Sequence, residues 1–325
     1  MSAKSSSMQR TEHLPLRASL KGVEPHCSRP EYSLVVTFVS FYEIGNPLLL
    51  LPKWGLSVAV SIFCLCVFLF ASAGNSRAQE GYQVVAVNQG GSITGTVMWA
   101  GPVPRPAVMT INKDAAVCDP DSQKERDLER LVIGPNRGVA NTVVYLKNIT
   151  RGKTMDLPEP RRFLDQKHCR YEPHILLVPL NGSLQMKSSD AVLHTVHMEG
   201  AATYNLPFPF ANRVTSRTMP TAGLVNIRCN GGHNWMNAEI LVVPHPYYAV
   251  TDINGNYRLT DVPPGNYELV AWHEGWGVAR LDAGFDVLTE RRVLRPIFTP
   301  PETWEKTVSV ESGRRSVVNF TISNK

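Results

Sequence analysis

Three side chains that bind soft metals lie close together near the middle of the chain. The stretch 226–236 reads NIRCNGGHNWM and places Cys229, His233 and Met236 in the pattern Cys-x3-His-x2-Met. Upstream, 191–198 reads AVLHTVHM and supplies His194 and His197. Two imidazoles, one thiolate and a weak axial thioether are the ligand set of an electron-transfer copper site. These residues therefore predict one bound copper ion.

Two upstream histidines compete for the remaining ligand position. Their odd spacing in an extended strand points His194 and His197 to opposite faces. We assign His194 as the ligand because it lies closer to the preceding turn, and we keep His197 as the alternate. His168 and His174 are assigned structural roles, although these extra histidines leave a second or non-blue copper site open.

A simpler interpretation needs no metal. In it, Cys229 is a buried thiol, Met236 fills the core and His233 lies on the surface. No Gly-x-Ser-x-Gly, His-Glu-x-x-His or phosphate-loop motif is present, so we expect no enzyme. His273-Glu274, between two tryptophans, is compatible with sugar contact, but we favour a structural tryptophan beside a solvated glutamate.

Cysteine usage bears on the thiol of the ligand loop. Three of the six cysteines follow residue 79: Cys118, Cys169 and Cys229. An odd number in an exported protein leaves one thiol over. If Cys118 pairs with Cys169, the remaining thiol is the one in the loop, although the sequence leaves the pairing open.

The N-terminal region predicts export. We assign no fold to residues 1–55. The segment 56–78 contains the apolar run LSVAVSIFCLCVFLFASA over 56–73. This run is either a signal peptide, which we favour, or a membrane anchor. Both options place the remainder outside the cytoplasm, in the periplasm or an equivalent compartment, where disulfides persist. We expect no other membrane contact.

Charge excludes some partners. The chain carries a net charge of +5. Residues 1–78 hold seven basic and four acidic residues, a net charge of +3, so the rest of the chain has a net charge of +2. We therefore expect no nucleic-acid partner. Oligomeric state is left open.

Short strands separated by turns are expected after residue 90. The chain has 23 Gly and 24 Pro and little helical periodicity, which is typical of an all-β protein. Strands are expected over 91–99, 138–149, 174–179, 182–186, 213–218, 224–229 and 238–244. Asn254-Gly255 predicts a hairpin, and 306–323 predicts another around Glu311–Arg314.

The span from about His174 to Pro244 resembles the cupredoxin family, within it the amicyanin and plastocyanin type. The motifs SDAVLHTVH and AGLVNIRCNGGHNWM carry the resemblance. It implies a Greek-key β-sandwich with His194, Cys229, His233 and Met236 on one copper ion. It also implies electron transfer with an extracytoplasmic redox protein that docks near an exposed edge of His233.

A second resemblance covers the span 245–323. Val250-Thr251-Asp252, Gly255-x-Tyr257-x-Leu259 and Val262-Pro263-Pro264-Gly265-x-Tyr267-x-Leu269 resemble the carboxypeptidase regulatory-like, or transthyretin-like, β-sandwich. We expect this sandwich to be discontinuous, formed by 90–150 and 246–323 with 160–245 inserted. Tandem sandwiches packed side by side are the alternative.

Two other functions remain open. Similar modules accompany rhamnogalacturonan lyases, so the chain is alternatively a carbohydrate or cell-envelope binding module without redox activity. Copper storage or delivery is the third possibility.

Overall fold

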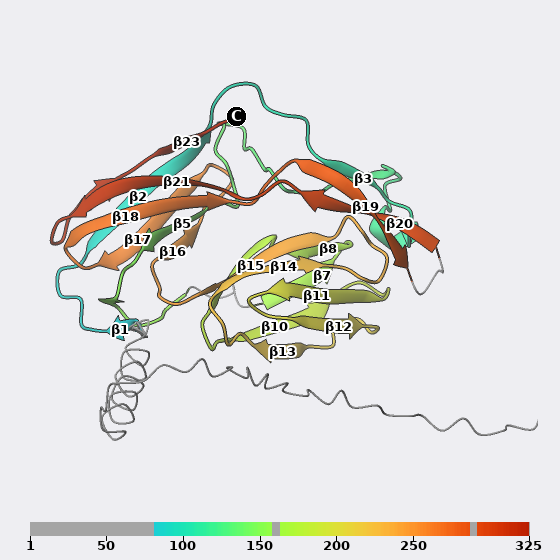
Figure 1. Cartoon of the computed structure of the whole chain (residues 1–325), viewed down its shortest axis with the longest axis horizontal. Coiled ribbons are helices and arrows are strands. Elements are labelled where there is room, and N and C mark those ends of the chain that lie inside the picture. The colour runs from blue at the N-terminus through green and yellow to red at the C-terminus, as the bar shows by residue number, and fades with distance from the viewer. Residues whose placement is uncertain (1–80, 158–162, 287–290, 325) are drawn as a thin grey trace, which may run out of the picture. The chain divides into compact units, whose positions relative to one another are not determined.

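The computed structural model describes residues 81–157, 163–286 and 291–324, which consist almost entirely of strands, turns and loops (Figure 1). Within these ranges α2, Ala115–Cys118, is the one α-helix. The prediction of an all-β protein is confirmed. No helix in the described ranges has the length and hydropathy needed to cross a bilayer. The expected segments 1–55 and 56–78 lie outside the described residues.

Residues 163–243, here called the central sandwich, form two sheets (Figure 1). The first has the order β13 (Thr215–Thr218), β10 (Ser183–Ser188), β7 (Phe163–Lys167) and β8 (Arg170–Glu172). The second has the order β12 (Tyr204–Phe208), β11 (His194–Gly200), β14 (Gly223–Arg228), β15 (Asn237–Val243) and β9 (Ile175–Pro179). Alternation along β14 buries Val225 and Ile227, whereas every residue of β9 is buried. The two sheets share one hydrophobic core.

A second pair of sheets, here called the flanking sandwich, is built from both ends of the described chain. One sheet has the order β16 (Tyr248–Val250), β5 (Val143–Lys147), β18 (Gly265–His273) and β21 (Glu302–Val310). The other contains β17 (Asn256–Val262), β2 (Gly91–Trp99), β22 (Arg315–Val317) and β23 (Phe320–Ile322), and both short strands pair with β2. A second core joins these sheets, with Ile93 from β2 and Leu146 from β5 in one cluster.

The early strands pair with late ones. β2 pairs antiparallel with β17, and β5 lies between β16 and β18. A discontinuous sandwich requires this pairing, and its boundaries at 90–150, 160–245 and 246–323 stay predictions. A third cluster, formed by Val143, Leu157, Ile175, Leu177 and Val243, connects β5 to β9 and β15.

The two predicted hairpins are wrong, although the turns are present. The turn at Asn254-Gly255 follows β16 and precedes β17, and these strands belong to different sheets. β21 and β22, on either side of Glu311–Arg314, also join different sheets. Gly255 has φ +75, and a Cβ there would lie 2.2 Å from the Val97 carbonyl oxygen, so this turn requires glycine. Each turn carries the chain from one sheet of the flanking sandwich to the other, and the alternating strands β17 and β21 each bury one face in the shared core.

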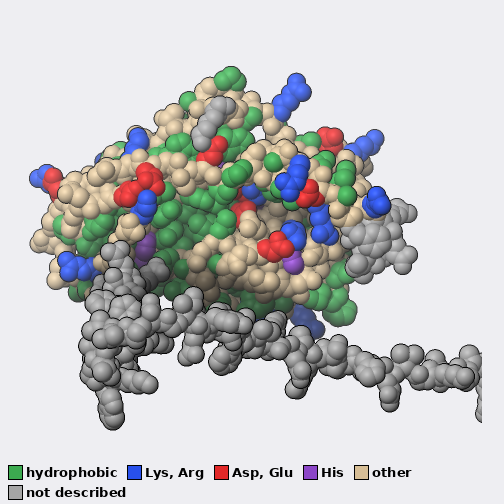
Figure 2. All heavy atoms as spheres, in the orientation of Figure 1, with side chains coloured by type: hydrophobic (Ala, Val, Ile, Leu, Met, Phe, Trp, Pro, Cys, Tyr) green, Lys and Arg blue, Asp and Glu red, His purple; other side chains and the backbone are tan. Residues whose placement is uncertain are grey.

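Three two-stranded ribbons complete the described strands. They are β1 (Gln83–Val84) with β6 (Arg151–Gly152), β3 (Val108–Thr110) with β4 (Glu125–Asp127), and β19 (Val278–Asp286) with β20 (Arg291–Phe298). Figure 2 shows basic and acidic side chains interspersed over the face in view, and no stripe of one sign is visible among its described residues.

Candidate metal centre

His194 is fixed at the first position of β11 by a buried carboxylate. Asp190, 7% exposed, accepts a hydrogen bond from His194 Nε2 at 2.9 Å. The same carboxylate accepts the backbone N–H groups of His168 and Cys169, each at 2.8 Å. Asp190 therefore ties the β7–β8 turn to the start of β11, and it leaves Nδ1 of His194 as the free nitrogen.

Cys229 directly follows β14, and a short loop returns the chain to β15. The loop closes on itself, since Met236 N donates to the His233 carbonyl at 3.0 Å. Backbone N–H groups of Thr195 and Gly231 point at Cys229 Sγ, at 3.4 and 3.3 Å. A Cβ on Gly231 would lie 3.3 Å from that sulfur and 3.1 Å from the Leu193 carbonyl oxygen. A side chain here would crowd the sulfur, and glycine allows the backbone to approach it closely.

Thr195 connects the two ligand segments. Its hydroxyl accepts the Asn230 N–H at 2.6 Å, and its own N–H points at the sulfur. The cupredoxin resemblance predicts a weakened connection here, because threonine follows His194 where asparagine is frequent, yet both contacts are present.

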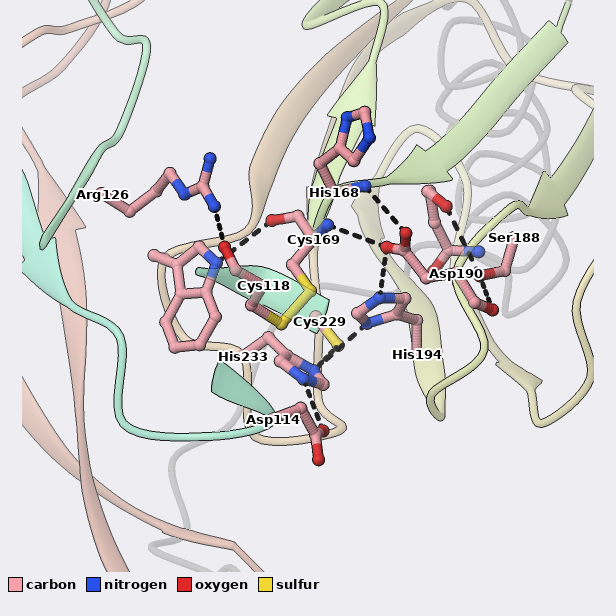
Figure 3. The surroundings of a disulfide bond; sticks show 12 residues. Asp114, Cys118, Arg126, His168, Cys169, Ser188, Asp190, His194, Cys229 and His233 are labelled. Carbon is pink, nitrogen blue, oxygen red and sulfur yellow. Dashed lines mark hydrogen bonds and ion pairs between the residues drawn. A yellow bond between two sulfur atoms is a disulfide. The ribbon is translucent and has the colours of Figure 1, made fainter. Parts of the chain in front are cut away.

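Three donor atoms converge in the interior (Figure 3). His194 Nδ1 lies 3.2 Å from His233 Nδ1, which lies 3.7 Å from Cys229 Sγ. The ligand atoms of these residues all lie within 4.8 Å of one another. Both histidines are 0% exposed and Cys229 is 2% exposed. One sulfur and two imidazole nitrogens in a dry cluster fit a borderline-soft metal such as copper.

Electrostatics in the cluster favour the thiolate, which is the form that binds metals. Burial raises the pKa of the Cys229 thiol, but hydrogen bonds and charge from His194 and His233 outweigh burial and hold that pKa well below its ordinary value. Burial likewise opposes a charged His194, yet Asp190 and Cys229 raise its pKa to about 9. The proton is therefore favoured on the imidazole rather than on the sulfur.

His233 is covered by a residue far away in the sequence. Its Nε2 lies 2.9 Å from Asp114 Oδ2, at the start of α2, and its ring packs edge-to-face on Trp235 at 5.4 Å between centroids. Lys113 Nζ from the same segment donates to the Gly231 carbonyl at 2.7 Å. The expected exposed edge of His233 is therefore wrong, because Asp114 and Trp235 bury the ring.

Met236 lies three residues beyond His233 in the same loop and is 1% exposed. It belongs to the core of the central sandwich and also lines a cavity of about 610 Å³. Cys229 lines the same cavity, as do β20 residues such as Phe298. Met236 is thus placed in the loop that carries two of the three converging ligands.

The other two cysteines downstream of residue 79 form a disulfide bond with each other. Cys118, the last residue of α2, forms a disulfide with Cys169 in the β7–β8 turn, with an Sγ–Sγ distance of 1.98 Å. Trp235 Nε1 donates to the Cys169 carbonyl at 3.1 Å. Cys229 is the free cysteine among the described residues.

No protein-family model matches the chain, and no curated protein matches it. Among solved structures it is similar to a reduced mutant of amicyanin, at 22% identity over 27% of this chain and 87% of that chain, with a TM-score of 0.24. It is also similar to a Cu-containing nitrite reductase, NirK, from Thermus scotoductus, at 16% identity over 28% of this chain and 23% of that chain, with a TM-score of 0.24. A Cu(I) form of another amicyanin mutant gives 22% identity over 27% and 87% of the two chains, with a TM-score of 0.23. Function must therefore be argued from the geometry of the cluster.

The other histidines named from the sequence lie elsewhere. His197 faces away from His194 and pairs with Glu199 at 2.9 Å and with Arg228. His168 is exposed, and its backbone rather than its ring contacts Asp190. Neither residue belongs to a group of converging metal donors within the described ranges.

His174 belongs to a buried ionic cluster that the sequence did not indicate. It contacts Glu274, which also pairs with Arg130 Nη1 at 2.6 Å. Arg130 pairs in addition with Glu239 of β15 at 3.1 Å. Glu274 is 0% exposed, so the solvated glutamate expected beside the tryptophans is wrong. Its carboxylate is kept inside the protein because a cation and an imidazole surround it.

Proposed function

We propose that the chain is an exported protein that binds one copper ion at His194, Cys229, His233 and Met236 and exchanges electrons through it. The observation that carries this proposal is the convergence of two Nδ1 atoms and one sulfur in a fully buried cluster. A bound copper ion would supply a one-electron couple between Cu(II) and Cu(I).

The protein's own groups prepare the ligands. Asp190 and Asp114 hold the Nε2 atoms of the two histidines, so that each ring keeps Nδ1 for the metal. Backbone N–H groups of Thr195 and Gly231 stabilise a negatively charged sulfur on Cys229. Ligands fixed in this way limit the rearrangement that accompanies a change of charge, as electron transfer requires.

The partner we propose is another extracytoplasmic redox protein. Because Asp114 and Trp235 cover His233, contact at that ring is closed to a partner. The cavity lined by Cys229 and Met236 offers the alternative approach to the site.

Copper storage or delivery is the second candidate, and one observation favours it. All three converging side chains are at most 2% exposed, which suits retention of an ion better than fast exchange with a docked partner. Reversible redox cycling of the loaded protein separates the two functions, since a storage site holds Cu(I) and cycles poorly.

The test is an optical spectrum of the purified full-length chain with one equivalent of Cu(II), repeated on Cys229→Ser. We expect an intense visible thiolate-to-copper band that a mild reductant bleaches and that the variant lacks. Met109→Leu, a substitution outside the cluster, serves as the control and should keep the band. A wild-type chain that takes up copper without this band would contradict the proposal.

A further inference from the structure

The Cys118–Cys169 disulfide lies against the ligand cluster (Figure 3). Both of its sulfurs lie within 4.8 Å of a ring nitrogen of His233 and of each other. A second group has its donor atoms within the same 4.8 Å of one another, and it consists of the Cys169 sulfur, an Asp190 oxygen and a His194 nitrogen. The disulfide therefore neighbours both histidines of the proposed copper site.

The surroundings of the disulfide are buried and held by hydrogen bonds. Cys118, Cys169 and His233 are all 0% exposed. The backbone of Cys169 is fixed on both sides, since its N–H donates to Asp190 and its carbonyl accepts Trp235 Nε1. At least the Cys169 sulfur would consequently stay near His233 after the bond between the sulfurs is broken.

We propose that reduction of the Cys118–Cys169 disulfide creates a second soft-metal site in which the two thiolates and His233 bind Cu(I). This inference rests on the proposed copper function in one respect, because His233 belongs to both ligand sets. The reduced chain would hold Cu(I) through additional sulfur ligands, whereas the oxidised chain keeps the one-thiolate site.

The chemistry needs an external dithiol as reductant. The dithiol supplies two electrons and two protons, the Sγ–Sγ bond breaks, Cys118 and Cys169 become thiols, and the dithiol closes to its own disulfide. Both cysteine protons are released when the thiolates bind a metal. Thiolates favour Cu(I), so reduction of the disulfide shifts the preference of the cluster toward this ion.

The experiment compares two full-length chains that both carry Cys27→Ser, Cys64→Ser and Cys66→Ser, so that the upstream thiols do not compete. One keeps Cys118 and Cys169, and the other carries Cys118→Ser and Cys169→Ser. Both are treated with dithiothreitol, freed of it anaerobically, and titrated with Cu(I) against a chromophoric Cu(I) chelator. Neither chain then has a disulfide, so the two differ only in the two thiols.

We expect Cu(I) to bind the thiol-containing chain at least about 10-fold more tightly than the serine variant. X-ray absorption of the reduced thiol-containing chain with Cu(I) gives a second readout, which does not need the serine variant to fold. The copper ion should have two more sulfur neighbours in this chain than in the chain whose disulfide is intact. Equal affinities, or an unchanged sulfur count, would overturn the inference. Failure of the proposed function is seen separately, as a missing visible band in the oxidised Cu(II) protein.

Discussion

At the scale of single residues, both ligand histidines present the same ring nitrogen to the cluster. The Nδ1 atoms of His194 and His233 lie 3.2 Å apart within 4.8 Å of the sulfur, and each ring has Nε2 on a carboxylate at 2.9 Å. A hydrogen-bonded Nε2 fixes the tautomer and the ring orientation before a metal binds. The two carboxylates differ in burial, because Asp190 lies inside the fold and the Asp114 side chain is 35% exposed.

Asp114→Ala tests this positioning at the more accessible carboxylate. Loss of the acceptor frees the His233 ring to rotate, so we expect the affinity for Cu(II) to fall by about 10- to 100-fold. Competition with a chelator of known affinity measures the change. Asp121→Ala, which removes an exposed carboxylate from the turn after α2, is the matched control and should bind copper as the wild type does. Equal affinities for both variants would show that Asp114 does not position the ligand.

His245 makes stability depend on pH through burial. It is 5% exposed beside Tyr82, Tyr247 and Tyr248, and burial lowers its pKa to about 4. In the unfolded chain His245 has the ordinary histidine pKa of about 6.5. Between pH 6.5 and pH 4 this side chain is therefore protonated in the unfolded state and neutral in the folded state. Its contribution to stability is therefore full above pH 6.5 and is lost as the pH falls toward 4.

His245→Gln isolates this effect. The difference in unfolding free energy between wild type and variant should be constant from pH 7 to 8. Below pH 6.5 the unfolding free energy of the wild type should fall relative to that of the variant, by up to about 1.4 kcal/mol per pH unit. Urea unfolding at a series of pH values measures both curves, and parallel curves down to pH 4 would refute the role of His245.

At the scale of elements, a single buried cation joins strands of both sandwiches. Arg130 pairs with Glu239 on β15 and with Glu274 just beyond β18, and it donates from Nε to the Gly275 carbonyl at 2.9 Å. Burial raises the pKa of Glu239 to about 7 although Arg130 opposes it. Two carboxylates that share one buried arginine depend on it for their charge.

Arg130→Met removes that cation while keeping most of the side-chain volume. We expect the unfolding free energy to fall by about 3–5 kcal/mol, because two carboxylates remain buried without their partner. Lys147→Met is the matched control: Lys147 also pairs with two carboxylates, Glu268 and Glu305, but at the surface, so its loss should cost at most about 1 kcal/mol. Urea denaturation measures both values, and comparable losses in the two variants would contradict the assigned role of burial.

The same scale shows what the sequence can predict. The apolar alternation of β14 and the continuous apolar run of β9 lie within the residues themselves, so these strands were predictable. The ligand loop was predictable for the same reason, since Cys229, His233 and Met236 are neighbours in the chain. Contacts between residues far apart in the sequence were not predictable, because no local pattern indicates them. Asp114 is 119 residues from His233, and Arg130 is 109 residues from Glu239.

Turn signals were informative only in part. Asn254-Gly255 marks a reversal of the chain, which depends on backbone conformation at two residues. Whether the flanking strands pair depends on which faces they bury, and this is settled by strands far away, such as β2 and β5. A local pattern therefore predicts the turn and not the sheet to which each strand belongs.

At the scale of the described molecule, contacts join the two sandwiches at more than one place. The cluster around Val143, Ile175 and Val243 adds apolar contact to the ionic contact of Arg130. Stabilisation at the metal centre should therefore extend to the flanking sandwich, which contributes no residue to the ligand set.

Calorimetry with and without copper tests this coupling. Free copper at 100 times its dissociation constant stabilises the state that binds it by about 2.7 kcal/mol. We expect one unfolding transition that shifts to higher temperature as a whole. Two transitions, of which copper shifts only one, would show that the sandwiches unfold independently.

The most direct test of the copper site is an anomalous difference map at the copper edge from crystals of the copper-loaded protein. We expect one strong peak enclosed by His194 Nδ1, Cys229 Sγ and His233 Nδ1. A peak at His168, His174 or His197 instead, or no peak at the cluster in a protein that has bound copper, would contradict it.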